Sequence, residues 1–200
     1  MINVPHILLA AGASRRMGEP KQLLKWGNKR LIQFQIENIL NTTKRLYVIL
    51  GAHADLIEPF LIGYDIELIR FNEWESGMGD SLAFGVKHIK NSLSNLDGIL
   101  ISLIDQPLVL TSHYLKMRNI FEKDKKQIIA SESDMGWAGV PILFDVFYFD
   151  QIMTLTGEKG ARFILKKNME NATLINAGNS LVDMDTPNIY KKLFSKFSPR

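Results

Sequence analysis

The sequence contains no cysteine, little net charge and no long apolar run. Without cysteine, the 200-residue chain has neither disulfide bonds nor thiolate metal sites, which is typical of proteins in a reducing compartment. The apolar stretch at residues 7–11 is too short for a signal peptide, and no stretch approaches the roughly 20 apolar residues of a membrane helix. We therefore expect a cytoplasmic protein with no membrane segment.

The low net charge argues against another class of partner. The chain has 24 Lys and Arg residues against 21 Asp and Glu residues, which gives a net charge of +3. This excess is too small to indicate nucleic-acid binding. We expect no nucleic-acid partner, and a small anionic molecule is the better candidate ligand.

Short apolar runs alternate with segments of helical periodicity. The runs predict strands at 4–10, 45–51, 65–71, 98–104 and 127–131, and the periodic segments predict helices at 31–40, 53–62, 80–90 and 112–123. No repeat or linker interrupts them, so we expect a single domain over residues 1–200. The alternation predicts an α/β fold of three layers, with a mostly parallel central sheet and helices on both faces. Ligands of such folds bind beyond the carboxyl ends of the strands.

The loop after the first expected strand is basic and contains two glycines. Gly12 and Gly18 allow sharp turns and a close approach of the backbone to a ligand. Arg15, Arg16 and Lys21 add positive charge that suits phosphate oxygens. The loop lacks the Gly-Lys-Ser/Thr ending of a P-loop and the third glycine of a dinucleotide fingerprint. These residues leave two interpretations open: an anion-binding loop or a solvated basic loop.

The loop after the third expected strand contains GMGD followed by a serine. Asp80 and Ser81 lie at the expected start of a helix, where side-chain caps and free backbone amides gather. Gly77 and Gly79 also permit a close approach of the backbone to a ligand. A dinucleotide fingerprint would have its last glycine at Leu82, so that motif is incomplete. A ligand-binding turn and an ordinary helix cap both stay open.

Acidic residues stand at two further points. Asp105 directly follows the fourth expected strand, and Asp183 and Asp185 precede a helix that we expect to begin near Pro187, with Thr186 as its cap. Two carboxylates facing a basic loop suit Mg²⁺ bound to phosphates, because Mg²⁺ takes few protein carboxylates and keeps several waters. The structural alternatives are a strand-ending turn and a capping cluster.

The motifs at these strand ends occur in a recognisable order. The residues LAAGASRRMGEPKQLL at 9–24 fill every position of the signature L-A-(A or G)-G-x-S-x-R-M-G-x-x-K-x-L-L. The later motifs are GMGDSL at 77–82, IDQP at 104–107, GVPILF at 139–144, TGEKGARFIL at 156–165 and DMDTP at 183–187. Together they resemble the MobA-like nucleotidyltransferases over nearly the whole chain. The resemblance implies a Rossmann-like fold similar to the nucleotide-diphosphosugar transferases.

Within that family, the chain looks closest to the molybdenum cofactor cytidylyltransferases. Ala10-Ala11-Gly12 resembles this branch, whereas the guanylyl branch usually has Ala-Gly-Gly. The resemblance implies transfer of CMP from CTP to the terminal phosphate of the molybdenum-pterin cofactor, with release of pyrophosphate. It also implies Mg²⁺ as cofactor and a client molybdenum hydroxylase as a further partner. Val140 departs from the pattern, because cytidylyl members often have a histidine there, and this departure bears on the acceptor.

The resemblance also implies roles for individual residues. Arg16, Lys21 and Asp105 are the implied catalytic residues, and Asp105 and Asp185 would hold Mg²⁺. The implied nucleotide-binding residues are Ala10, Ala11, Gly12, Ser14, Arg16, Lys21, Gly79, Ser81 and Asp105. Attack of an acceptor phosphate oxygen on the α-phosphorus requires no nucleophilic side chain, so catalysis depends on positioning and on charge neutralisation.

Other functions fit the same motifs. The alternatives are a guanylyltransferase, or a transferase for a sugar phosphate or another small molecule on the same scaffold. A third alternative is a carrier that brings the cofactor to a molybdenum hydroxylase without turning it over. The presence of Lys21, Asp105 and Asp185 favours catalysis, because a carrier needs no Mg²⁺ site.

Overall fold

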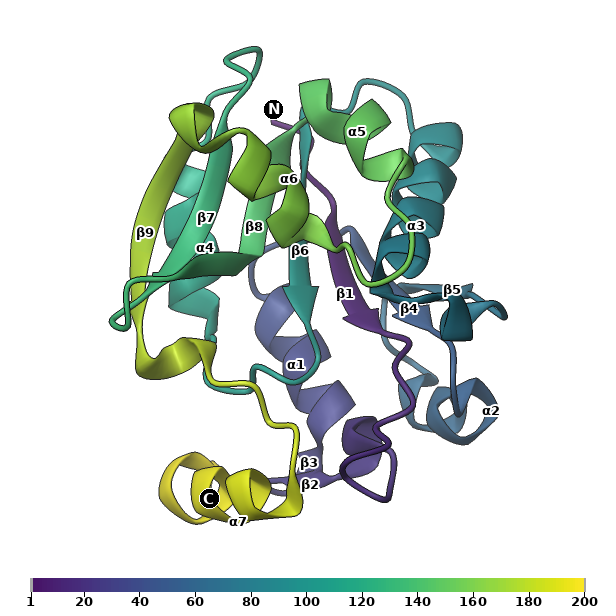
Figure 1. Ribbon diagram of the computed structural model, residues 1–200. Coiled ribbons are helices and arrows are strands. Elements are labelled where there is room, and N and C mark those ends of the chain that lie inside the picture. The colour runs from purple at the N-terminus through teal and green to yellow at the C-terminus, as the bar shows by residue number, and fades with distance from the viewer. Residues whose placement is uncertain (1, 200) are drawn as a thin grey trace.

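A sheet of seven strands forms the middle of the structure, a computed structural model that describes residues 2–199 (Figure 1). The strand order is β5-β4-β1-β6-β8-β7-β9. β8 runs antiparallel to both of its neighbours, and the other ladders of this sheet are parallel. The strands are β1 (His6–Ala10), β4 (Leu46–Leu50), β5 (Glu67–Arg70), β6 (Gly98–Leu103), β7 (Ile128–Ser133), β8 (Ala138–Asp145) and β9 (Ala172–Gly178). A separate hairpin consists of β2 (Lys25–Trp26) and β3 (Lys29–Arg30).

The five expected strands are confirmed, but β8 and β9 were not predicted. Pro141 in β8 has no backbone N–H to donate, and proline within an apolar run argues against a central strand. In the structure, the register between β7 and β8 shifts between Ala130 and Ser131, so that Pro141 falls at an irregularity of the ladder where its missing donor is tolerated. β9 lies at the edge of the sheet and is only half buried, so it lacks the apolar run of a central strand.

Helices cover the sheet on both sides. The α-helices are α1 (Leu31–Leu40), α2 (Ala54–Ile57), α3 (Met78–Ser92), α4 (Thr111–Asn119), α5 (Phe149–Met153), α6 (Ala161–Lys167) and α7 (Pro187–Phe197). The expected helix at 31–40 is confirmed as α1. The expected helix at 53–62 is wrong in most of its length, because α2 is a single turn and Pro59 leads into a 3₁₀ helix at Glu58–Leu61. None of the helices within residues 2–199 has the length and apolar character needed to cross a membrane.

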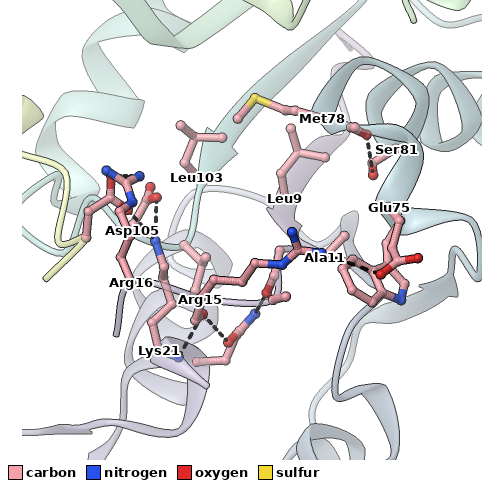
Figure 2. A pocket seen from close by; sticks show the side chains of 18 of the residues that line it. Leu9, Ala11, Arg15, Arg16, Lys21, Glu75, Met78, Ser81, Leu103 and Asp105 are labelled. Carbon is pink, nitrogen blue, oxygen red and sulfur yellow. Dashed lines mark hydrogen bonds and ion pairs between the residues drawn. The ribbon is translucent and has the colours of Figure 1, made fainter. Parts of the chain in front are cut away.

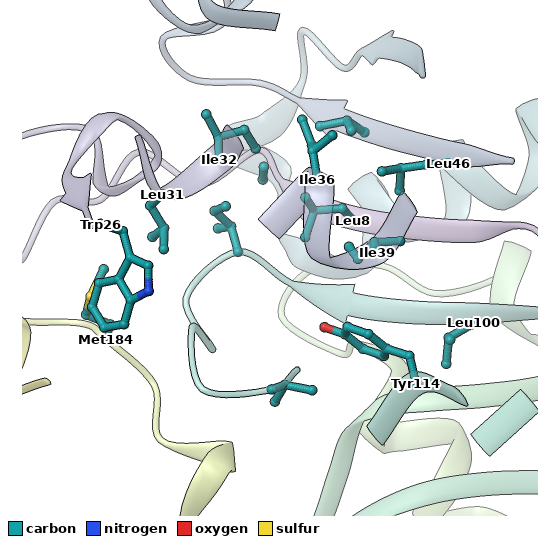
Figure 3. Packing of buried hydrophobic residues seen from close by; sticks show 14 of the residues in the cluster. Leu8, Trp26, Leu31, Ile32, Ile36, Ile39, Leu46, Leu100, Tyr114 and Met184 are labelled. Carbon is teal, nitrogen blue, oxygen red and sulfur yellow. The ribbon is translucent and has the colours of Figure 1, made fainter. Parts of the chain in front are cut away.

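Two apolar clusters confirm the three-layer arrangement. On one face, Leu8 of β1 packs in a cluster with Ile36 of α1 and Tyr114 of α4 (Figure 3). On the other face, the next residue back, Ile7, belongs to a cluster with residues of α3, α5 and α6, including Ile89. Successive side chains of a strand point to opposite faces, so β1 contributes to both clusters. Both faces of the central strands are therefore buried, which explains why these strands are apolar throughout.

The C-terminal helix α7 packs against the β2–β3 hairpin and directs the preceding segment toward the sheet. Thr186 caps the helix by accepting a hydrogen bond from the backbone of Ile189 at 3.4 Å, and Pro187 is its first residue, as expected. Phe194 lies edge-on to buried Trp26, with 6.1 Å between ring centroids. This packing fixes the course of residues 182–186, which precede the helix. These residues pass beside the turn after β6, where Met184 bonds the carbonyl of Asp105.

Candidate active site

A cavity of about 410 Å³ opens at the carboxyl ends of β1 and β6 (Figure 2). Its walls come from five places: the loop after β1, the residues at 74–81 around the start of α3, the turn after β6, and two segments late in the chain. At one end lie Arg16, Lys21 and Asp105, and at the other lie Glu75 and Ser81. The cavity therefore has a strongly charged end and an end built from the start of a helix.

The loop after β1 makes a tight turn before it reaches Lys21. Ser14 has a positive φ of 55°, and its carbonyl accepts a hydrogen bond from the backbone of Met17 at 2.8 Å. A non-glycine residue in this conformation carries backbone strain, which is often found at functional sites. Met17 is buried and holds the far side of the turn, whereas the side chains of Arg15 and Arg16 are exposed at its tip. The turn thus presents two guanidinium groups near the cavity.

Lys21 joins two carboxylates that are far apart in the chain. Its ammonium group donates to Asp105 Oδ2 at 2.9 Å and to Asp185 Oδ1 at 2.7 Å. The other carboxylate oxygen of Asp185 accepts a hydrogen bond from Arg16 Nη2 at 2.7 Å. The side chain of Lys21 is only 10% exposed, so its ammonium group is largely shielded from water, whereas Arg16 reaches the cluster from the exposed side. The structure therefore brings Arg16, Lys21, Asp105 and Asp185 together in one charge centre.

The electrostatics of this cluster keep Lys21 and Asp185 charged. Burial alone lowers the pKa of Lys21, but the charges and hydrogen bonds of Asp105 and Asp185 outweigh it, so the pKa is raised above its ordinary value. Burial alone raises the pKa of Asp185, but Lys21 and Arg16 outweigh it, so that pKa is lowered. Lys21 is therefore a cation and Asp185 an anion at neutral pH.

Asp105 also has an unsatisfied oxygen. Its Oδ1 atom is buried and has no hydrogen-bond partner, although a buried polar atom normally has one. Among residues 2–199, no group of three or more His, Asp or Glu side chains gathers as a metal site. Asp105 and Asp185 therefore offer two carboxylates, and Oδ1 of Asp105 has no hydrogen-bond partner. This donor set fits Mg²⁺, which binds one or two carboxylates together with substrate phosphates.

Asp183 and Asp185 differ in their surroundings, although both lie close to Asp105. Asp183 accepts a hydrogen bond from Gln106 Nε2 at 3.1 Å and does not line the cavity. Burial, and next the charge of Asp105, raise the pKa of Asp183. Between the two aspartates, the backbone N–H of Met184 donates to the carbonyl of Asp105 at 2.8 Å. This bond fixes the segment 183–185 against the turn after β6, and only Asp185 reaches the charge centre.

Comparison with known proteins identifies the family. A family model described as "MobA-like NTP transferase domain" matches residues 6–172. The chain belongs to this family. The purine catabolism protein PucB of Bacillus subtilis (strain 168) is 30% identical over 197 residues, which cover 92% of each chain.

A molybdenum cofactor guanylyltransferase of Campylobacter jejuni (strain 81116) is 31% identical over 130 residues, which cover 62% of this chain and 60% of that protein. The crystal structure of Rv0371c from Mycobacterium tuberculosis H37Rv has the same fold, with a TM-score of 0.82 at 23% identity over 97% of this chain and 98% of that one. These likenesses agree with the nucleotidyltransferase-like fold expected from the sequence. The chain is accordingly a nucleotidyltransferase of the MobA-like family.

The other predicted nucleotide-binding residues of this MobA-like chain divide into two groups. Ala11, Gly12, Ser14 and Ser81 line the cavity, and the hydroxyl of Ser81 donates to the carbonyl of Gly77 at 3.1 Å. Two residues do not line it. Ala10 is buried at the end of β1, and Gly79 faces another loop of the protein.

Gly79 and Asp80 hold the GEKG motif of residues 157–160 against the start of α3. The backbone N–H of Gly79 donates to the carbonyl of Gly157 at 2.7 Å, and Asp80 Oδ2 accepts from the backbone N–H of Gly157 at 2.6 Å. A Cβ on Gly77 would lie 2.3 Å from the Gly157 carbonyl oxygen, so only glycine permits this approach. We call Gly79, Asp80 and Gly157 the loop clasp. It places Glu158 in the wall of the cavity.

In the structure, α3 starts earlier than the sequence predicted. The helix begins at Met78 rather than at residue 80, with Gly77 as its cap, and neither Asp80 nor Ser81 caps it. Cavity residues that the sequence did not indicate include Trp74, Glu75 and Glu158. They come from segments whose proximity depends on tertiary packing, and the family motif at 156–165 was the available signal for Glu158.

Val140, which stands where the family often has a histidine, does not line the cavity. It lies in β8, is 8% exposed, and belongs to the same apolar cluster as Leu9 and Ala11. In place of the histidine that is frequent in the family, this chain therefore has an apolar residue in the core, next to residues that line the cavity.

The lowered pKa of Asp185 makes its contribution to stability depend on pH. The contribution is complete above the ordinary aspartate pKa of 3.8 and is lost as the pH falls through the lower pKa of the folded protein. We expect Asp185→Asn to lower the free energy of unfolding at neutral pH and to have progressively less effect below pH 3.8. Urea unfolding across this range measures the difference. Asp150→Asn, at an exposed pair with Lys90, is the control. An equal loss at every pH would contradict the prediction.

Removing the carboxylate of the loop clasp should loosen the loop that carries Glu158. Asp80→Ala leaves the N–H of Gly157 without its acceptor, so we expect faster hydrogen exchange of that amide and a loss of about 1–3 kcal/mol in the free energy of unfolding. Hydrogen exchange measured by mass spectrometry on peptides across 154–160 tests this. Asp150→Ala is the matched control. Unchanged exchange at Gly157 would refute the role of Asp80.

Proposed function

We propose that this nucleotidyltransferase transfers CMP from CTP to the terminal phosphate of the molybdenum-pterin cofactor and releases pyrophosphate. The observation that carries the proposal is the centre of Arg16, Lys21, Asp105 and Asp185 at the charged end of the cavity. In the reaction, an oxygen of the acceptor phosphate bonds to the α-phosphorus while the bond from that phosphorus to the pyrophosphate oxygen breaks. The protein has to orient the two phosphates and neutralise their charge.

The loop after β1 suits the triphosphate. A Cβ on Gly12 would meet no atom within 4 Å, so its backbone borders open space in the cavity. Arg16 bonds Asp185, but its side chain is 72% exposed, so phosphate oxygens have access to its planar guanidinium, which provides paired donors. Lys21, fixed by two carboxylates, supplies a cation whose position is already set. Such preorganised charge stabilises the charge that develops in the transition state.

Asp105 and Asp185 would hold the Mg²⁺ ion. When bound, the ion neutralises phosphate charge and assists departure of the pyrophosphate. Asp105 contributes its vacant Oδ1 atom, and Asp185 contributes a carboxylate that stays ionised near neutral pH. Lys21 bridges the same two carboxylates, so it keeps both oriented toward the place where phosphates and metal would meet.

The choice of CTP rests on Ala11. Ala11 lines the wall of the cavity, and its carbonyl accepts a hydrogen bond from the backbone of Ala52 at 3.0 Å. A Cβ on Gly51 would lie 2.8 Å from the same carbonyl oxygen, so the backbone there is closely packed and Ala11 has little freedom to move. A fixed methyl group at this wall narrows the space for a base and favours a pyrimidine. GTP is the alternative donor, supported by the similarity to the guanylyltransferase of Campylobacter jejuni.

The acceptor and the client are supported by the relatives. The guanylyltransferase of Campylobacter jejuni is named for the molybdenum cofactor, and PucB of Bacillus subtilis is named for purine catabolism. Together these names favour the molybdenum-pterin cofactor as acceptor and a purine-oxidising molybdenum hydroxylase as the client that receives the product.

The donor and acceptor can be identified in one experiment. The protein is incubated with the molybdenum-pterin cofactor, Mg²⁺ and an equimolar mixture of the four nucleoside triphosphates, and the products are analysed by mass spectrometry. We expect the cytosine dinucleotide, and we expect Ala11→Gly to raise the use of GTP relative to CTP by about tenfold. If the guanine dinucleotide is the main product, the donor is GTP and not CTP. Nucleotide binding without pyrophosphate release would favour a carrier. A product formed from a sugar phosphate instead of the pterin would show that the acceptor is a sugar phosphate.

The charge centre can be tested by two substitutions. Lys21→Ala and Asp105→Ala should each lower the rate of pyrophosphate release by about a hundred- to a thousandfold, because each removes a preorganised charge. Lys25→Ala, at an exposed lysine of β2, is the control for the loss of a surface cation. Circular dichroism and thermal unfolding verify that the variants are folded. Near-normal turnover in either variant would refute the role of that residue.

A further inference from the structure

We propose that Gln22 is a positioning residue that holds the loop after β1 in the shape that binds the triphosphate. Gln22 stands at the unassigned position of the signature K-x-L-L, directly after Lys21. Its side chain is fully buried at the wall of the cavity. The proposal rests on the proposed function, because both concern the same nucleotide site.

Gln22 uses both ends of its amide on the loop. Its Nε2 atom donates to the carbonyl oxygen of Ala10 at 2.7 Å and to that of Gly12 at 3.1 Å. Its Oε1 atom lies 3.5 Å from the hydroxyl of Ser14, which donates toward it. One side chain therefore contacts three residues of the strand end and loop at 10–14, all of them within the signature.

These bonds fill the gaps in the hydrogen bonding of the strand end. The carbonyls of Leu9 and Ala11 accept from the backbones of Ile104 and Ala52, at 3.1 and 3.0 Å. Ile104 follows β6 and Ala52 follows β4, the two neighbours of β1, so backbone bonds hold the strand end from both neighbouring strands. The carbonyls of Ala10 and Gly12 accept from Gln22 instead. The four successive carbonyls at 9–12 are thus all bonded, two by backbone and two by a single glutamine side chain.

Holding these carbonyls also sets the direction of the amides that follow. In a planar trans peptide, the N–H of the next residue points away from the carbonyl. With the carbonyls of Ala10 and Gly12 turned toward Gln22, the N–H groups of Ala11 and Ala13 point away from it. Both of these residues line the cavity. Gln22 therefore fixes the orientation of backbone donors that a phosphate group requires.

Gln22 also connects the loop to the charge centre. Lys21 is its neighbour in the 3₁₀ helix Lys21–Leu23, and the backbone N–H of Lys21 donates to the Ser14 hydroxyl at 3.1 Å. The same hydroxyl contacts Gln22. The backbone donors of the loop and the ammonium group of Lys21 are therefore held at a fixed separation. A triphosphate that spans both would meet them already in place.

The test uses Gln22→Met, which keeps the length and apolar volume of the side chain but donates no hydrogen bond. We expect two observations: faster hydrogen exchange of the amides of residues 11–15 in the free protein, and a dissociation constant for CTP and for GTP, measured calorimetrically with Mg²⁺, that is at least about tenfold higher. In turnover assays, KM for the nucleotide should rise while KM for the acceptor stays unchanged.

Asn38→Leu is the matched control. Asn38 is also a buried amide, but it bonds the backbone of Val109 and Thr111, away from the cavity. Asn38→Leu should lower the melting temperature at least as much as Gln22→Met, while nucleotide binding and the hydrogen exchange of residues 11–15 stay unchanged. A Gln22→Met protein whose exchange and nucleotide affinity match the wild type within twofold overturns the proposal. Equal losses of affinity in both variants also overturn it, because they indicate general destabilisation.

Gln22→Glu supplies a further readout. An ionised glutamate only accepts hydrogen bonds and faces two carbonyls, whereas a protonated one donates one bond. Nucleotide affinity of Gln22→Glu relative to the wild type should therefore improve as the pH falls, and a ratio that does not change with pH overturns the role. Exchange at residues 11–15 requires no substrate. A wild type that transfers no nucleotide to the pterin would refute the proposed function while the exchange data still decide the role of Gln22.

Discussion

The ammonium group of Lys21 between the carboxylates of Asp105 and Asp185 is the interaction on which the arrangement of the site depends. It joins positions that are 84 and 164 residues apart in the chain. Closing such long loops costs conformational entropy. The sheet already brings Lys21 and Asp105 close together, because β1 and β6 are neighbours in it. A buried cation held by two carboxylates is tolerated only because its charge is paired. If either carboxylate were removed, part of the charge of Lys21 would be buried without a partner, and this would destabilise the fold.

Polar side chains hold the backbone of the cavity loops, in addition to the apolar burial of Met17. Gln22 bonds the carbonyls of the first loop, and Asp80 bonds the amide of Gly157 in the last one. Each side chain satisfies backbone groups that would otherwise need water. A cavity built in this way keeps its dipoles oriented before any substrate arrives, which is the condition for electrostatic catalysis at low reorganisation cost.

The sequence predicted the parts of this structure that depend on local pattern. Strands buried on both faces are apolar throughout, so β1, β4 and β6 could be located, and the rule that loops follow the carboxyl ends of parallel strands placed Lys21 and Asp105 at one edge. The role of Gly79 could not be predicted, because its partner Gly157 lies 78 residues away and only packing reveals that the glycine makes room for another loop. β8 was missed because Pro141 is acceptable only at a register shift that no local pattern indicates.

The capped C-terminal helix has a consequence for the order in which the protein matures. Asp185 lies beyond residue 172, where the match to the family model ends, and it is carried to the charge centre by a segment that α7 fixes against the β2–β3 hairpin. During synthesis, β1, the basic loop and β6 emerge well before that segment. Without it, Lys21 has Asp105 as its one carboxylate partner among the two that it bonds in the folded protein. The segment that carries Asp185 and balances the charge of Lys21 is therefore synthesised after the strands and the loop that it completes.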